Sequence, residues 1–159
     1  MLPIGEHSST NARIDRVPLE RIAPPTDTEL ADCGEQVWRL KLFFSRFRRF
    51  GAIEFFPSFP GCGFIDASIG DIFVHEHLFE IKAGDRRFLS VDLKQLITYA
   101  ALNSLERTRE IKYLGLFNPR VGISYTVPLE QLCQEISGTS ASELLGEIVR
   151  VISSGDISR

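Results

Sequence analysis

Residues 70–84 bring together side chains that could act on a phosphate group. The segment is typical of a β-hairpin with residues 75–76 at its turn, and in that register Asp71 lies opposite Glu80. Because side chains alternate between the two faces of a strand, Asp71, Glu80 and Lys82 share one face. The opposite face is apolar and consists of Ile72, Val74, Phe79 and Ile81.

The facing carboxylates of Asp71 and Glu80 would repel each other in the absence of a cation. Hard divalent cations such as Mg²⁺ bind carboxylate oxygens, water and substrate phosphates. Such a metal lowers the pKa of water, and the Lys82 ammonium beside it could neutralise charge that develops on a phosphate. The pattern therefore predicts phosphodiester hydrolysis. A surface hairpin with an ordinary ion pair between Glu80 and Lys82 is the open alternative.

Asp66 is a rival to Asp71 as the first acidic ligand. The strand that we expect to begin at Gly63 runs on into Asp71, and even-numbered positions on it point to the apolar face. Asp66 would therefore face the core unless a β-bulge intervened. We favour Asp71 for this reason.

A transition-metal site at the tip of the hairpin is a further alternative. Its ligands would be a His-x-His pair and a cysteine, namely His75, His77 and either Cys62 or Cys33. The sequence lacks the regular four-ligand spacing of zinc modules, and polar residues are common in turns. We rank this alternative below the magnesium site.

Basic residues after the hairpin are candidates for contacting a phosphate backbone. Arg86 and Arg87 follow Lys82 closely, and guanidinium groups can bind phosphate oxygens in a bidentate manner. Lys94, in the next expected helix, belongs to the same candidate nucleic-acid-binding set. The alternative for Arg86 and Arg87 is an ordinary charged loop.

Residues 90–102 predict a helix with Ser90 as its N-cap and Asp92 in its first turn. Gln95 and Tyr99 are four residues apart, so they lie on one stripe of this helix with Asp92. Beside the carboxylates and lysine of the hairpin, Gln95 and Tyr99 could hydrogen-bond the scissile region and position a substrate. By itself, this spacing is most often just a polar helix stripe.

An earlier helix is expected from Glu29 to about Phe50, with Asp27 or Thr28 as its N-cap. Its apolar residues are too many for one narrow stripe, which predicts a helix buried on a wide side. Its basic residues form either a phosphate-contacting surface or a solvated side: Arg39, Arg46 and Arg49, with Lys41 and Arg48 nearby.

The remaining segments predict a single α/β domain with a mixed sheet, the hairpin at its centre and helices on its faces. Further strands are expected at 51–56, 63–71, 111–117 and 121–127, and further helices at 128–136 and 140–152. Proline-rich residues 1–27 are expected to form an extended arm, and residues 28–159 the domain.

Composition limits the classes of protein that the chain could belong to. Its 159 residues suffice for one domain with a substantial core. A formal net charge of −3 argues against non-specific coating of nucleic acid but allows a local basic face. Three cysteines without a CxxC pair argue against a disulfide framework and favour a reducing cytoplasm. No apolar run is long enough to cross a bilayer, so we expect no membrane partner.

The order of these motifs resembles that of the PD-(D/E)XK nuclease superfamily. Its members present an Asp, a Glu-x-Lys and often a helical Gln-x-x-x-Tyr in this order, and the matching residues here are Asp71, Glu80, Lys82, Gln95 and Tyr99. The resemblance covers roughly residues 29–127, with one departure, because Gly70 and not a proline precedes Asp71. It implies a restriction-endonuclease-like core with a central mixed β-sheet flanked by helices.

The resemblance also implies roles for these residues. Asp71 and Glu80 would bind Mg²⁺ or Mn²⁺, and Lys82 would be the catalytic lysine. The first-helix glutamate of many members would fall on Glu35, or with less support on Glu29. The implied activity is metal-dependent hydrolysis of phosphodiester bonds in DNA, or else RNA, within a restriction, repair or anti-phage defence system. A homodimer or a larger complex is compatible with this activity. The alternative is a non-catalytic nucleic-acid-binding or assembly subunit that keeps the nuclease core.

Overall fold

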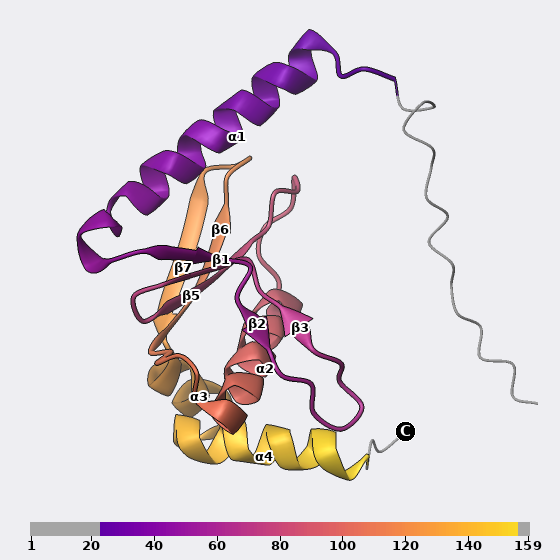
Figure 1. The fold of residues 1–159 in the computed structure, drawn as a ribbon, viewed down its shortest axis with the longest axis vertical. Coiled ribbons are helices and arrows are strands. Elements are labelled where there is room, and N and C mark those ends of the chain that lie inside the picture. Colours follow the sequence, from indigo (N-terminus) through magenta and orange to yellow (C-terminus); the bar gives the residue numbers. More distant parts are fainter. Residues whose placement is uncertain (1–22, 156–159) are drawn as a thin grey trace, which may run out of the picture.

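A five-stranded mixed sheet forms the centre of the fold in the computed structural model, which describes residues 23–155 (Figure 1). In the order β1-β4-β5-β6-β7, its strands are Ile53–Phe55, Ile72–Val74, His77–Ile81, Tyr113–Asn118 and Ile123–Pro128. The β5/β6 pair is parallel and the other pairs are antiparallel. A separate small sheet pairs β2 (Ser58–Phe59) with β3 (Ser68–Ile69). The expected α/β class with a mixed sheet flanked by helices is confirmed.

Helices pack on both faces of this sheet (Figure 1). One face is covered by α1 (Asp27–Ser45), which the 3₁₀ helix η2 (Arg48–Phe50) follows. The other face is covered by α2 (Ser90–Glu106), α3 (Leu129–Ser137) and α4 (Ala141–Ser154). None of the helices within residues 23–155 has the length and hydropathy of a membrane-spanning segment. Of the expected arm, residues 1–22 lie outside the described part of the chain.

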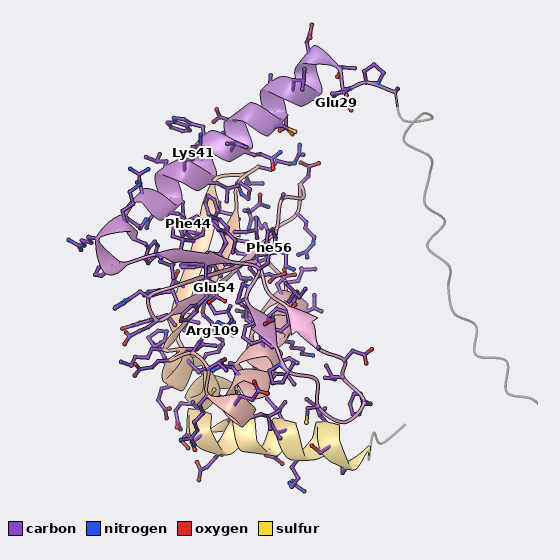
Figure 2. The ribbon with its side chains drawn as sticks, viewed as in Figure 1. Glu29, Lys41, Phe44, Glu54, Phe56 and Arg109 are labelled. Atoms are coloured by element: carbon purple, nitrogen blue, oxygen red, sulfur yellow. The ribbon has the colours of Figure 1, made fainter. Side chains whose placement is uncertain are left out.

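Alternation along β5 divides the core into two clusters. Phe79 faces α1 and packs against Phe43 and Phe44, whereas Leu78 faces α2. Figure 2 shows Phe44 directed from α1 toward the sheet. Gly115 pairs with Phe79 across the parallel strands, and a Cβ at this position would lie 2.2 Å from the Phe79 ring. The aromatic cluster under α1 therefore requires glycine at this position of β6.

The α1 helix is less buried than its sequence predicts, so the expected wide buried side is wrong. The helix meets the sheet through Phe43 and Phe44 near its C-terminal end, whereas Val37 is 49% exposed and Trp38 57% exposed. Its N-cap is Thr26, whose side chain accepts a hydrogen bond from the Glu29 backbone, and not Asp27 or Thr28. Apolar side chains on α1 therefore remain available at the surface.

The expected long strand over residues 63–71 is not continuous. β3 ends at Ile69 and β4 begins at Ile72, with Gly70 and Asp71 between them. Gly70 donates its N–H to the carbonyl of Pro57, and the carbonyl of Asp71 accepts the N–H of Phe56. The chain therefore leaves the small β2/β3 sheet at Gly70 and enters the central sheet at Ile72. Asp71 lies between the two, at the end of the central sheet.

Candidate functional site

The hairpin of β4 and β5 forms in the predicted register, which pairs Ile72 with Phe79. Asp71 directly precedes the paired segment, and its Oδ2 accepts a hydrogen bond of 2.7 Å from the Ile81 backbone nitrogen. The Asp71 side chain thus takes the place of a main-chain acceptor where the ladder would otherwise end. This bond holds the carboxylate of Asp71 beside Glu80.

A hydrogen-bond network connects β5 with α2 through Glu80. Its Oε1 accepts hydrogen bonds from Lys82 Nζ at 3.0 Å and from Gln95 Nε2 at 2.8 Å. Lys82 Nζ also donates to Gln95 Oε1 at 2.8 Å, so these three side chains close a ring of contacts. Gln95 Nε2 donates to the hydroxyl of Tyr99 at 2.7 Å, and Tyr99 donates to the carbonyl of Ile69 at 3.2 Å. The structure therefore brings together Glu80 and Lys82 of the hairpin with Gln95 and Tyr99 of the helix, as the sequence predicts.

Glu80 is a buried carboxylate with unused hydrogen-bonding capacity. The residue is 6% exposed, and within residues 23–155 its Oε2 is buried without a hydrogen-bond partner. Burial raises the pKa of Glu80 above its usual value, the hydrogen bond from Lys82 opposes this shift, and the charge of Asp71 adds to it. A carboxylate that is costly to ionise and has a free oxygen is suited to binding a cation.

Asp92 is a second buried carboxylate beside this network, and the sequence analysis places it only on the helix stripe and in the first turn. Both of its oxygens accept hydrogen bonds of 2.7 Å from the Arg86 guanidinium, and Asp92 Oδ1 lies 4.0 Å from Lys82 Nζ. Arg86 is the main cause that lowers the pKa of Asp92 to about 2. The N-cap of α2 is Leu89 and not Ser90 as predicted, and Asp92 Oδ2 in the first turn accepts the Leu89 backbone N–H.

The basic residues nominated for nucleic-acid binding differ in their surroundings. The Arg86 guanidinium is bound to Asp92 in a bidentate manner, so this side chain is directed toward the protein. Arg87 and Lys94 are exposed, and neither forms an ion pair with any residue in the described part of the chain. Of the three, Arg87 and Lys94 thus remain open to a ligand.

The two candidates for a first-helix acid lie outside the network. Glu35 is exposed and pairs with Arg39 at 2.8 Å, and Arg39 in turn donates to the carbonyl of Pro119 at 3.1 Å. Glu29 forms the capping box with Thr26. Both acids belong to α1, which packs on the face of the sheet opposite α2. They help to fix α1 and have no contact with Glu80.

The rival ligands are also separate from the network. Asp66 lies exposed in the loop between β2 and β3, so the expectation that it faces the core is wrong. Cys62 lies 3.1 Å from the hydroxyl of Ser153, and Cys33 is exposed on α1. His75 stacks on Phe50 at the hairpin tip. The side chains proposed for a zinc site are thus spread over the molecule: His75 and His77 at the tip, Cys62 near α4 and Cys33 on α1.

The site fits a hard divalent cation better than a structural zinc. Asp71 and Glu80 offer two neighbouring carboxylates, and Glu80 Oε2 is buried without a partner among the described residues. No group of three or more His, Cys, Asp or Glu side chains that could hold a metal occurs between residues 23 and 155. Mg²⁺ usually retains water and binds through one or two carboxylates together with substrate phosphates. Two protein ligands are therefore sufficient for Mg²⁺.

Comparison of the chain with protein-family models, with curated proteins and with solved structures gave no match. We therefore assign no family to the chain.

Proposed function

We propose that this chain is a nuclease that uses Mg²⁺ or Mn²⁺ to hydrolyse phosphodiester bonds of DNA, and that its sheet and helices form a restriction-endonuclease-like core. The observation that supports this proposal is the network around Glu80. It joins the Glu80 carboxylate, Lys82 and the helical Gln95/Tyr99 pair, and Asp71 is held beside it by its bond to the Ile81 N–H at the end of the central sheet. A role in restriction, repair or anti-phage defence rests on the sequence resemblance alone.

Two carboxylates would hold the cation. One is the carboxylate of Asp71 at the end of the β4/β5 ladder, and the other is that of Glu80, through its free Oε2. A bound divalent cation supplies positive charge and lowers the pKa of water. This chemistry matches the requirement of phosphodiester hydrolysis, in which water adds across a P–O bond to give a phosphate monoester and a hydroxyl group.

Besides the cation, the Lys82 ammonium supplies a positive charge at the site. Its ammonium donates to Glu80 and Gln95 and has a third N–H, which can donate to a phosphate oxygen as negative charge develops there. Gln95 fixes Lys82 and Glu80 relative to each other through its one amide group. Tyr99 holds that amide in place by accepting its second N–H. Gln95 and Tyr99 therefore act by positioning.

The test is cleavage of supercoiled plasmid and of single-stranded and duplex oligonucleotides by the purified chain, with Mg²⁺, with Mn²⁺ and with chelator. We expect nicked or shortened products with either metal, no product with chelator, and no product from Glu80→Gln. Cleavage by Glu80→Gln at the rate of the unmodified chain would contradict the proposal.

The second candidate is a non-catalytic nucleic-acid-binding or assembly subunit that keeps the same core. The observation that favours it is the contact of Lys82 with Glu80 at 3.0 Å, which already balances the charge of this carboxylate without a metal. In that case the chain would bind DNA and leave it intact under every metal tested. A Mg²⁺-dependent cleavage activity that Glu80→Gln lacks would exclude this candidate.

A further inference from the structure

A pocket of about 410 Å³ opens between α1 and the edge strand β1. Its walls are mainly apolar and include Leu40 and Phe44 from α1 and Ile53 and Phe55 from β1. Asp71 also lines it, so the pocket reaches the candidate metal site. An apolar pocket that ends at the carboxylate of a candidate catalytic site can hold the part of a substrate next to the reacting group.

Two aromatic side chains stand at this pocket with most of their surface in solvent. Phe55 is 61% exposed and Phe56 is 70% exposed. Phe56 also adopts a left-handed backbone conformation, with φ of +57°, which is unfavourable for a bulky side chain. Its N–H donates to the carbonyl of Asp71, so the strained residue is attached directly to the candidate site. Figure 2 shows Phe56 at the end of β1, with Phe44 on α1.

Two cations accompany these rings. Lys41 and Arg48 line the same pocket from the side of α1 and η2, and both are exposed. Neither forms an ion pair with any residue between 23 and 155. An apolar peptide segment would bury these charges without compensation, which is unfavourable. A ligand that carries both a flat apolar group and a negative charge matches the apolar walls and the two cations.

We propose that this pocket binds an unpaired base of single-stranded DNA, with the adjoining phosphates on Lys41 and Arg48. Aromatic side chains bind single strands by stacking on bases, and basic side chains follow the backbone. A base in this pocket places a neighbouring phosphate beside Asp71. A base inside a duplex can enter only after unpairing, which costs energy. The inference rests on the proposed nuclease function and specifies its substrate as single-stranded DNA or a strand with unpaired nucleotides.

The test is binding measured by fluorescence anisotropy in chelator, so that cleavage does not contribute. The probes are a single-stranded oligothymidylate of about 12 nucleotides, an oligonucleotide of the same length without bases, and a duplex. We expect the oligothymidylate to bind at least about fivefold more tightly than the abasic strand, which has the same phosphates, and more tightly than the duplex.

The Phe56→Gly variant separates stacking from folding. Glycine relieves the left-handed backbone and removes a ring that is largely exposed, so the melting temperature should be unchanged or higher. We expect this variant to lose the preference for the oligothymidylate while its affinity for the abasic strand stays the same. The matched control is Phe64→Ala, which removes another exposed ring, outside the pocket, and should keep the preference.

The roles of Lys41 and Arg48 are tested with the same anisotropy measurement. Lys41→Gln and Arg48→Gln should weaken binding to the normal and the abasic strand equally, and each should reduce the slope of log K against log salt by about 0.7. Arg150→Gln on α4 is the control, and it should leave the slope unchanged.

Three outcomes would overturn the inference: equal affinity for the normal and abasic strands, a preference that persists in Phe56→Gly, or a chain that is a dimer in solution and becomes a monomer in Phe56→Gly. The last outcome would mean that a second copy covers the pocket.

Failure of the proposed nuclease function can be distinguished from failure of the pocket proposal. A base preference without cleavage under any metal would refute the nuclease and keep the pocket, whereas Mg²⁺-dependent cleavage without a base preference would refute the pocket alone.

Discussion

The Gln95 amide nitrogen lies 2.8 Å from Glu80 Oε1, which ties α2 to the central strand β5 at a buried carboxylate. The same amide accepts a hydrogen bond from Lys82. Gln95 therefore satisfies a buried acid and holds the lysine next to it.

Gln95→Ala should lower the free energy of unfolding by about 1–3 kcal/mol, because a buried carboxylate loses a donor and Lys82 loses an acceptor. It should also reduce cleavage more than DNA binding, since Lys82 is no longer held in place. Urea unfolding, cleavage rates and anisotropy measure the three quantities. Gln131→Ala is the control, because Gln131 bonds to Glu135 on the exposed side of α3 and should change stability by under about 0.5 kcal/mol.

Glu80→Gln should raise the melting temperature in chelator at neutral pH. The folded pKa of Glu80 is raised, chiefly by burial, so the ionised carboxylate destabilises the folded protein. The sign follows from linkage: stability of the unmodified chain falls as pH rises from the unfolded pKa, about 4.3, toward the higher folded value. The advantage of Glu80→Gln should therefore increase across this window and stay constant above it. Melting curves between about pH 4 and about pH 8 test this.

Mg²⁺ should stabilise the unmodified chain, by about 2.7 kcal/mol at a hundredfold excess over Kd, and should not stabilise Glu80→Gln. A metal shift of equal size in both proteins would show that the cation binds elsewhere.

Asp71→Asn and Asp71→Ala should differ in stability although both lose the charge. Asparagine keeps an oxygen that can accept the Ile81 N–H, whereas alanine leaves this N–H at the end of the ladder without its acceptor. We expect Asp71→Ala to lose about 1–3 kcal/mol relative to Asp71→Asn. Both variants should lose cleavage and the Mg²⁺-induced rise in melting temperature. Equal melting temperatures for the two variants would refute the structural role of the Asp71 carboxylate.

Lys82→Ala should lower the cleavage rate by about 10²–10³-fold, which is the effect of removing one preorganised donor from a reacting centre. Its affinity for DNA should change little, because one of several cations is lost. Single-turnover cleavage and anisotropy separate the two effects. Lys112→Ala is the control: Lys112 pairs with Glu76 and Glu110 away from the site and should leave the rate unchanged.

Asp92 should contribute to acid stability. Arg86 holds its pKa at about 2, below the ordinary 3.8, so its contribution is complete above about pH 4 and is lost as pH falls through 2. Asp92→Asn can still accept the Leu89 N–H but has no charge to pair with Arg86. The difference in urea midpoint between this variant and the unmodified chain should therefore shrink from about pH 4 down to about pH 2. A difference that does not vary over this range would refute the role of the Arg86 pair.

The relative placement of the candidate site residues could be predicted because it follows local rules. Strand alternation and a two-residue turn were sufficient to place Asp71 near Glu80 and to put Lys82 on the face of Glu80. The four-residue spacing of a helix placed Gln95 over Tyr99. The parallel β5/β6 pair lies far apart in sequence, and neither its register nor the requirement for glycine at position 115 follows from a local pattern.

Other features of the structure do not follow from local patterns, because they depend on the path of the chain between elements. The sequence predicts Arg86 as a candidate phosphate contact, and it does not reveal that the turn between β5 and α2 also brings the Arg86 guanidinium onto Asp92. The burial of α1 was overestimated because periodicity does not reveal how much of a helix meets the sheet. Val37, Leu40 and Lys41 of α1 instead line the pocket beside β1, which no motif in the sequence indicates.

The bond between Asp71 Oδ2 and the Ile81 N–H gives the site a spectroscopic signal of its own. A cation that draws electron density from this carboxylate weakens the hydrogen bond, so the amide proton resonance of Ile81 should move upfield as the site fills. Amides elsewhere on β5 donate to main-chain carbonyls, whose charge a cation at Asp71 barely alters. A single backbone resonance can therefore follow occupancy of the site in the unmutated chain, even when no substrate is being turned over.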